Sequence, residues 1–254
     1  MVGIRAGSPH TGINSTGLVR LLASLGLASA GMGRPSGADK LGHWLDWTDD
    51  IALSTALADQ GAPAAGGHAG RARAPSNAAA SAQAAQAARS ALTGLRAELL
   101  QAITAQAPQR APAGPPDEVV DPAPYRQAYQ AQQRAMQARS SSLRDLVRQM
   151  LLKGGPPLSR LAALDAVLDK ALAGRERQLL SALPSLMEKH FKALRQARQA
   201  GWLEAFGQDT QAMLMAELEI RLLPIEGMMQ ALMSTLAVRQ PQPLLLNQPP
   251  PAAA

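Results

Sequence analysis

The residues of this chain that could do acid–base or metal chemistry are most concentrated in the segment LGHWLDWTDD, residues 41–50. His43, Asp46 and Asp50 would share one face if the segment were an unbroken helix, because residues three and four apart lie on the same side. Metal-ligating histidines usually come with a second strong ligand group and an orienting partner. This cluster has one histidine, and its carboxylates suit the first turn of a helix. We interpret it as structural, and we expect no metal ion here.

Trp44 and Trp47 are the most distinctive side chains of the same segment. Tryptophan has a large apolar ring with one polar N–H group, which suits it to cores and to the centres of protein interfaces. We therefore take both residues as candidate interface residues, with a place in the core as the alternative.

Other catalytic arrangements find little support in the chain. The absence of cysteine excludes disulfides, thiolate nucleophiles and cysteine-ligated zinc. The four histidines are scattered and include no HExxH pair, no GxSxG elbow occurs, and the glycines of AGMGRPSG (30–37) lack the Lys-Ser/Thr of a P-loop. We expect a protein that is not an enzyme and that has no cofactor.

A run of basic residues offers an alternative function. Lys189, Lys192, Arg195 and Arg198 recur every three residues, and the chain has a formal net charge of +6. Such a run could contact the phosphates of a nucleic acid. A three-residue period drifts around a helix, however, and a charged run on a helix is usually its solvated face. We regard nucleic-acid binding as the less favoured of the two functions.

The elements that position these residues are predicted to be helices. Aromatic residues make up only 3% of the chain, and Ala, Leu, Gln, Arg, Glu and Met supply most of it. These residue types favour helices, whereas the β-branched and aromatic residues that favour sheets are scarce. The sequence predicts an all-α fold of long amphipathic helices that form a helical bundle or coiled coil, with a small N-terminal helical unit and disordered linkers.

Capping residues, apolar spacing and Pro/Gly-rich stretches divide the chain into segments. The predicted segments are an N-terminal helical unit (15–59), a disordered Ala/Gly/Ser-rich linker (61–87), a helix (88–107) that could extend back into the Ala-rich run, a Pro-rich linker (108–123), a C-terminal helical bundle or coiled coil (124–239) and a disordered tail (240–254).

The last helical stretch has the most regular apolar pattern. Large apolar residues follow one another at spacings of three and four, which is typical of a heptad seam. The candidate interface residues of this seam are Leu218, Leu222, Met229 and Leu232. The sequence does not decide whether the seam packs within the chain or against a partner. Pro184 and Pro224 are expected to kink or interrupt their helices.

Two features bear on where the protein resides. No window reaches the roughly 18 consecutive apolar residues of a membrane span. The first residues, MVGIRAGSPHTGINSTG, contain no uninterrupted apolar core of a secretory signal. Together with the missing cysteines, these features lead us to expect a cytoplasmic protein without a membrane span.

Two pairs of stretches resemble a family of uncharacterised bacterial proteins, a domain of unknown function. They are LVRLLASLGLA (18–28) with LGHWLDWTDDIALSTALA (41–58), and RLAALDAVLDKALAGRERQLL (160–180) with MAELEIRLLPIEGMMQAL (215–232). The resemblance brings no established activity and no catalytic residues. It implies an accessory of an envelope-associated assembly, near OmpA-like peptidoglycan-binding and membrane-anchored coiled-coil proteins. We therefore expect a non-enzymatic helical adaptor that binds a protein partner or forms a homo-oligomer.

Overall fold

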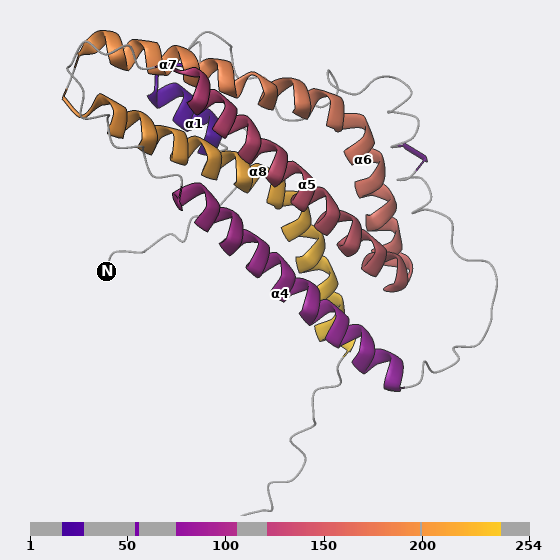
Figure 1. Ribbon diagram of the computed structural model, residues 1–254. Coiled ribbons are helices and arrows are strands. Elements are labelled where there is room, and N and C mark those ends of the chain that lie inside the picture. The colour runs from indigo at the N-terminus through magenta and orange to yellow at the C-terminus, as the bar shows by residue number, and fades with distance from the viewer. Residues whose placement is uncertain (1–16, 28–53, 56–74, 106–120, 199, 240–254) are drawn as a thin grey trace, which may run out of the picture.

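The computed structural model describes residues 17–27, 54–55, 75–105, 121–198 and 200–239 of the chain (Figure 1). Within these ranges the regular elements are helices and none is a strand, so the predicted all-α fold is confirmed. The long elements are α1 (Gly17–Ser24), α4 (Pro75–Ala105), α5 (Ala123–Lys153), α6 (Pro156–Ser181), α7 (Leu183–Ala197) and α8 (Trp202–Arg239).

Helix α8 is the central element of the bundle. It packs against α1, α4, α5, α6 and α7, and its side chains between Met213 and Leu222 are buried on most sides. A helix that is apolar around its circumference belongs in the interior of a fold. Figure 1 shows the resulting arrangement, with α6 and α7 along one side of the α5 and α8 pair and α4 along the other.

Polar contacts fix the directions of the helices around α5. Arg126 pairs with Glu188 of α7, and Arg144 pairs with Asp165 of α6, so residue numbers rise along α5 while they fall along its neighbours. α5 therefore runs antiparallel to α6 and α7.

By contrast, α5 and α8 run in the same direction. Tyr129 contacts Glu217 and Gln137 contacts Arg221, so residue numbers rise together along the two helices. Two parallel neighbours need a long connection to bring the chain back to the same end of the bundle. α6 and α7 are that connection.

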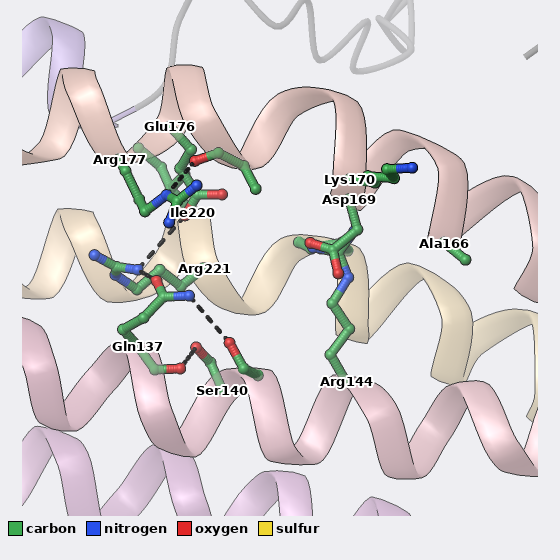
Figure 2. A pocket seen from close by; sticks show the side chains of 13 residues that line it. Gln137, Ser140, Arg144, Ala166, Asp169, Lys170, Glu176, Arg177, Ile220 and Arg221 are labelled. Carbon is green, nitrogen blue, oxygen red and sulfur yellow. Dashed lines mark hydrogen bonds and ion pairs between the residues drawn. The ribbon is translucent and has the colours of Figure 1, made fainter. Parts of the chain in front are cut away.

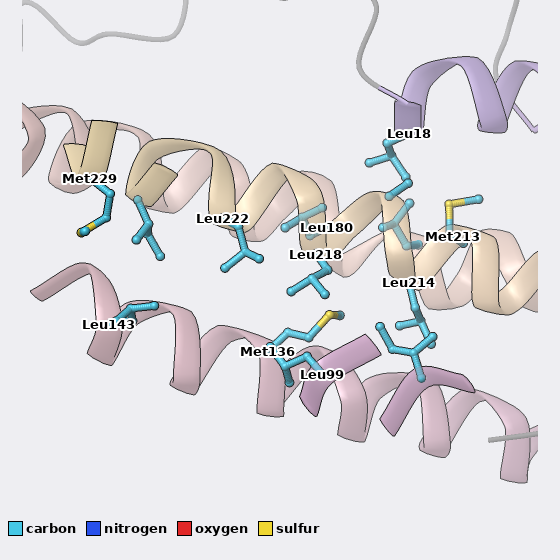
Figure 3. Packing of buried hydrophobic residues seen from close by; sticks show 14 of the residues in the cluster. Leu18, Leu99, Met136, Leu143, Leu180, Met213, Leu214, Leu218, Leu222 and Met229 are labelled. Atoms are coloured by element: carbon cyan, nitrogen blue, oxygen red, sulfur yellow. The ribbon is translucent and has the colours of Figure 1, made fainter. Parts of the chain in front are cut away.

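The core lies along the line where α4, α5 and α8 meet. Figure 3 shows Leu218 of α8 beside Met136 of α5 and Leu99 of α4, and Met229 opposite Leu143. Burial of such side chains contributes about 1.5–3 kcal/mol each relative to exposure, which makes this line the main source of stability.

The turn between α5 and α6 contains two glycines, and its backbone requires glycine at position 155. Gly155 has a φ of 104°, a conformation that L side chains rarely adopt. A Cβ on Gly154 would lie 2.4 Å from Cδ1 of Leu158, so the leucine side chain would have to shift. Pro156 then opens α6, where a missing N–H costs no helical hydrogen bond.

The two prolines inside the predicted helices behave differently. Pro184 lies in the first turn of α7, directly after the break that ends α6 at Ser181, so the expected interruption is confirmed there. Pro184 has no N–H to donate to the carbonyl of Leu180, and the side-chain amide of Gln133 donates to that oxygen at 2.9 Å. Pro224 lies inside α8, which continues through it and changes direction in Figure 1.

Helix α4 corrects the predicted limits of the middle of the chain. The linker was predicted to extend to residue 87 and the helix to cover 88–107, but α4 begins at Pro75 and ends at Ala105. The prediction required large apolar side chains, whereas Ala85 and Ala88 are buried against the bundle. Small side chains let a helix approach its neighbours closely, so alanine alone can provide a packing face.

The other predicted boundaries shift less. α5 begins at Ala123, one residue inside the predicted Pro-rich linker 108–123, and the carboxylate of Asp121 accepts a hydrogen bond of 2.9 Å from the N–H of Ala123. Of the predicted N-terminal unit 15–59, α1 is the main described part, and it packs against α8. The predicted tail 240–254 lies outside the described residues.

None of the helices in the described part of the chain is long and apolar enough to cross a membrane.

Candidate functional site

The most buried polar group of the described chain is the carboxylate of Glu217 on α8, which is 0% exposed. Its Oε2 accepts hydrogen bonds from the Tyr129 hydroxyl at 3.3 Å and from the Gln133 amide at 2.9 Å. Its Oε1 accepts from Arg221 Nε at 3.1 Å and Nη2 at 2.6 Å. A buried carboxylate is tolerated because it has these partners. The group ties α5 to α8.

Burial and the neighbouring carboxylate shape the chemistry of Tyr129. Burial of the ring raises the pKa of the Tyr129 hydroxyl well above its usual range, and the negative charge and hydrogen bond of Glu217 raise it further. Arg221 opposes this shift but does not cancel it. Tyr129 therefore acts as a hydrogen-bond donor and stays protonated at neutral pH.

A second polar cluster joins α5 to α6. Asp165 is buried and accepts hydrogen bonds from Arg144 Nη2 at 2.7 Å and from Arg148 Nη2 at 2.7 Å. Asp169, one turn further along, pairs with the same two arginines at 2.6 and 2.9 Å. Charge-assisted contacts of this kind are stronger than neutral hydrogen bonds and more geometrically specific. The cluster sets the register of α6 on α5.

Arg148 shows how the cluster compensates for burial. Burial lowers the pKa of a guanidinium, but hydrogen bonds to Asp165 and Asp169 together with their negative charges outweigh this effect and raise the pKa of Arg148. The arginine is therefore held in its charged form by its partners.

Aromatic residues gather at the end of the bundle where α5, α7 and α8 meet. The rings of Tyr125, Phe191 and Phe206 lie with centroids 5.1–5.7 Å apart, and Trp202 packs edge-on against Phe191 at 5.1 Å. Beside them, His190 Nε2 lies 2.7 Å from Asp209 Oδ2, which joins α7 to α8. The contact between the histidine and its carboxylate partner thus holds α7 and α8 together at this end of the bundle.

A polar pocket of about 360 Å³ lies between α5, α6 and α8 (Figure 2). Its floor on α5 includes Gln137 and Arg144, and Arg221 of α8 lies at its wall. The α6 side supplies charged residues of both signs around two alanines, namely Ala166, Asp169, Lys170, Ala173, Glu176 and Arg177. The volume and the polar lining of this pocket suit a small polar molecule.

The predicted seam on α8 is used inside the chain. Leu218, Leu222, Met229 and Leu232 are all buried in the core formed with α4 and α5. The prediction that these residues form a surface for a partner is wrong, because α4 and α5 of the same chain cover the apolar stripe of α8. The heptad-like spacing predicted a packing face correctly but could not identify what covers it.

The basic run lies on α7 and at its end. Lys189, Lys192, Arg195 and Arg198 are all exposed, and each three-residue step falls short of the helical repeat of about 3.6 residues. The residues therefore spread around the helix instead of forming one stripe. Lys192 also pairs with Glu188 at 2.7 Å, and that hydrogen bond and charge, helped by Arg126, lower the pKa of the Glu188 carboxyl.

Trp44, Trp47 and the cluster of His43, Asp46 and Asp50 lie outside the described residues. Within the described ranges, no group of three or more His, Cys, Asp or Glu side chains is placed to hold a metal ion.

Sequence reasoning missed the polar groups that the structure brings together. The α5 residues Arg144 and Arg148 lie one turn apart, as do Asp165 and Asp169 on α6, and this matched spacing of opposite charges on neighbouring helices is a signal that could have found the cluster. Glu217 had no such signal, because its partners Tyr129 and Gln133 lie 88 and 84 residues away in the sequence.

Comparison with known proteins adds one relationship. No curated protein and no solved structure matches the chain. One family model matches residues 5–234, which is most of the 254 residues and covers α1, α4, α5, α6, α7 and all but the last five residues of α8. The chain therefore belongs to the family described as protein of unknown function (DUF3348).

Proposed function

We propose that this protein is a non-enzymatic helical adaptor that binds a protein partner or a second copy of itself. In this proposal it acts in the bacterial cytoplasm as an accessory of an envelope-associated assembly, whose other members are OmpA-like or membrane-anchored coiled-coil proteins. The helical bundle serves as the scaffold, and the Trp44 and Trp47 segment carries the interface.

One observation carries the proposal: the charged side chains that could do chemistry are occupied in holding helices together. Arg144 and Arg148 bind Asp165, and Arg221 binds Glu217, all across or along helix contacts. Every buried side-chain nitrogen and oxygen in the described ranges has a hydrogen-bond partner. Fully satisfied buried networks make a fold rigid and specific. A rigid helical bundle of this kind is suited to presenting a binding surface to a partner.

The assignment of the interface to Trp44 and Trp47 follows from the use of the other candidates. The apolar seam of α8 is covered within the chain, so it is not free to bind a partner. Tryptophan residues are enriched among the few side chains that dominate binding energy at interfaces. The two tryptophans are therefore the strongest remaining anchors.

The proposal is tested by capture with the full-length chain. Size-exclusion chromatography with light scattering gives the oligomeric state, and an affinity capture from bacterial lysate with identification by mass spectrometry gives the partner. We expect either a stable oligomer or specific capture of an envelope protein of the stated classes. A strictly monomeric chain that captures no specific partner contradicts the proposal.

A pair of variants tests the position of the interface. Trp44→Ala combined with Trp47→Ala is expected to abolish capture or self-association while the helical circular dichroism and the unfolding midpoint stay unchanged. Leu223→Ala, which truncates a leucine that is 63% exposed on α8, is the control and is expected to retain binding. A tryptophan variant that unfolds, or that binds as well as the control, contradicts this position.

A further inference from the structure

The polar pocket arises from a repeated pattern on α6. Ala166 is followed by Asp169 and Lys170, and seven residues later Ala173 is followed by Glu176 and Arg177. A seven-residue repeat returns to nearly the same face of a helix, so both sets face α5 and α8. The alanines leave open space where larger side chains would fill the gap.

Helix α8 contributes to the same opening. Ile220, Arg221 and Pro224 line the wall of the pocket. Pro224 has no N–H to donate to the carbonyl of Ile220, and prolines inside helices bend them. The pocket thus lies beside Pro224 of α8 and where α6 presents small side chains.

The two arginines deepest in the pocket are already paired. Arg144 binds Asp165 and Asp169, and Arg221, which is 6% exposed, binds Glu217 and Glu176. Each arginine is shared between two carboxylates, so these pairs offset the charges of the two lining carboxylates, Asp169 and Glu176, only in part. The attraction for an incoming anion therefore has to come from the other cations of the lining.

Two cations on the rim of the pocket, Arg177 and Lys170, differ from these two arginines in their partners. Arg177 makes one described hydrogen bond, from Nε to the carbonyl of Ala173 on its own helix, which leaves its terminal N–H groups available. Lys170 is exposed, and the described part of the chain offers it no carboxylate partner. Figure 2 shows these two residues apart along α6, on either side of the α8 residue Ile220.

The floor adds a neutral donor. The Ser141 hydroxyl oxygen accepts a hydrogen bond of 3.0 Å from the Gln137 amide, so its own O–H can donate to a ligand. An oxygen-rich ligand over the floor would meet this hydroxyl between the two flexible cations. All three groups are donors, and this is the chemistry that recognises phosphate and carboxylate oxygens.

From this arrangement we infer that the pocket binds a small organic polyanion bearing phosphoryl or carboxylate groups, with Lys170 and Arg177 as its charge contacts and Ser141 as a hydrogen-bond donor. The volume of about 360 Å³ lies within the range of about 300–1,000 Å³ that is usual for small-molecule sites. The inference does not depend on the adaptor function, because it rests on residues of α5, α6 and α8 and not on Trp44 or Trp47.

The test is calorimetric titration of the full-length chain with pyrophosphate and, separately, with citrate, at constant ionic strength set by sodium chloride. The expected result is saturable binding of at least one probe, together with an unfolding midpoint that rises with its concentration. Binding of pyrophosphate alone assigns the phosphoryl class, and binding of citrate alone assigns the carboxylate class. Failure of both probes to bind overturns the inference.

Two variants locate the binding. Lys170→Ala with Arg177→Ala removes charge and keeps the space, and it is expected to weaken binding by about tenfold or more for each cation. Ala173→Leu keeps the charge and fills the space, and it is expected to abolish binding. Lys170 and Arg177 have no described partners on other helices, and Ala173 borders the open space of the pocket, so the unfolding midpoint of either variant without ligand should change little.

A double variant of the same charge change is the control. Arg134→Ala with Lys189→Ala removes two exposed cations that do not line the pocket. It is expected to bind the probe as the unmodified chain does. Equal weakening in the control and in the Lys170/Arg177 variant, or unchanged binding in Ala173→Leu, overturns the inference.

Discussion

Glu217 is a single side chain that links α8 to α5, because its carboxylate accepts hydrogen bonds from Tyr129 and Gln133. Removing it by Glu217→Ala leaves the Arg221 guanidinium, which is 6% exposed, without its closest charged partner, and it leaves the buried hydroxyl of Tyr129 without its acceptor. Breaking a buried pair from one side typically costs about 3–5 kcal/mol. We expect that loss in the free energy of unfolding, measured by denaturant titration.

Glu219→Ala is the matched control, because Glu219 lies on the same helix and is exposed. Its replacement should change stability by about 0.5 kcal/mol or less. If the two variants are equally stable, the network around Glu217 does not hold the helices together.

Tyr129 gives the bundle a sensitivity to alkaline pH. Its pKa is raised in the folded chain, whereas in the unfolded chain it lies near the ordinary value of about 10. A group whose folded pKa is raised contributes stability that is fully present below its unfolded pKa and is lost as pH rises above it. The unfolding midpoint should therefore fall as pH increases beyond about 10.

The variant Tyr129→Phe isolates this effect. It retains Tyr125, whose pKa burial also raises, but removes the hydroxyl that contacts Glu217. Unfolding midpoints measured across this pH range should fall less steeply in the variant than in the unmodified chain. Identical slopes would show that Tyr129 does not titrate differently in the two states.

At the scale of residues, local spacing carried only part of the information. It marked Leu218 and Leu222 as members of a packing face, and both are buried. It could not place Glu217 beside them as a buried charge, because two of the partners that make such burial tolerable, Tyr129 and Gln133, come from α5, 84 or more residues away in sequence. Burial of a polar residue is decided by tertiary pairing.

At the scale of elements, Asp165 holds α6 on α5. Asp165→Asn retains the shape of the side chain and removes the charge that two partly buried arginines share. The cost should lie between that of a surface pair and that of a fully buried pair, about 2 kcal/mol. Thermal or denaturant unfolding measures the loss.

Asp145→Asn is the corresponding control. Asp145 pairs with Arg148 at 2.7 Å, as Asp165 does, but the side chain of Asp145 is 69% exposed. The control should lose about 0.5 kcal/mol or less. Equal losses at the two positions would mean that burial does not set the strength of this cluster.

The limits of the elements show what sequence can and cannot predict. Glycine and proline marked the end of α5 at Lys153 and the break before α7, because these residues change what the backbone itself can do. The start of α4 at Pro75 was missed, since an alanine-rich run becomes a stable helix only when another surface packs on it. The polar pocket was missed for the same reason, because it exists only where three helices meet.

For the whole molecule, composition was sufficient to predict the fold class but not the topology. Scarce aromatic and β-branched residues made helices the expected elements, and the chain is all-α. The seam of α8 could have joined two chains or the helices of one chain. In the structure, α4 and α5 of the same chain cover this seam. Helices α6 and α7 return the chain between the two parallel helices, α5 and α8.

One chain closes the bundle around α8, and because the sequence contains no cysteine, introduced cysteines can test this directly. Arg96 of α4 and Glu226 of α8 form a surface pair at 2.8 Å, so replacing both costs little stability. The variant Arg96→Cys with Glu226→Cys is treated with a short bifunctional thiol reagent. The control pairs Arg96→Cys with Gln208→Cys, which lies near the far end of α8.

Denaturing electrophoresis and mass spectrometry of the treated protein decide the question. We expect the Arg96/Glu226 pair to give a cross-linked product with the mass of one chain, and the control pair to give none. A product with the mass of two chains, or equal cross-linking of both pairs, would contradict a bundle closed within one chain.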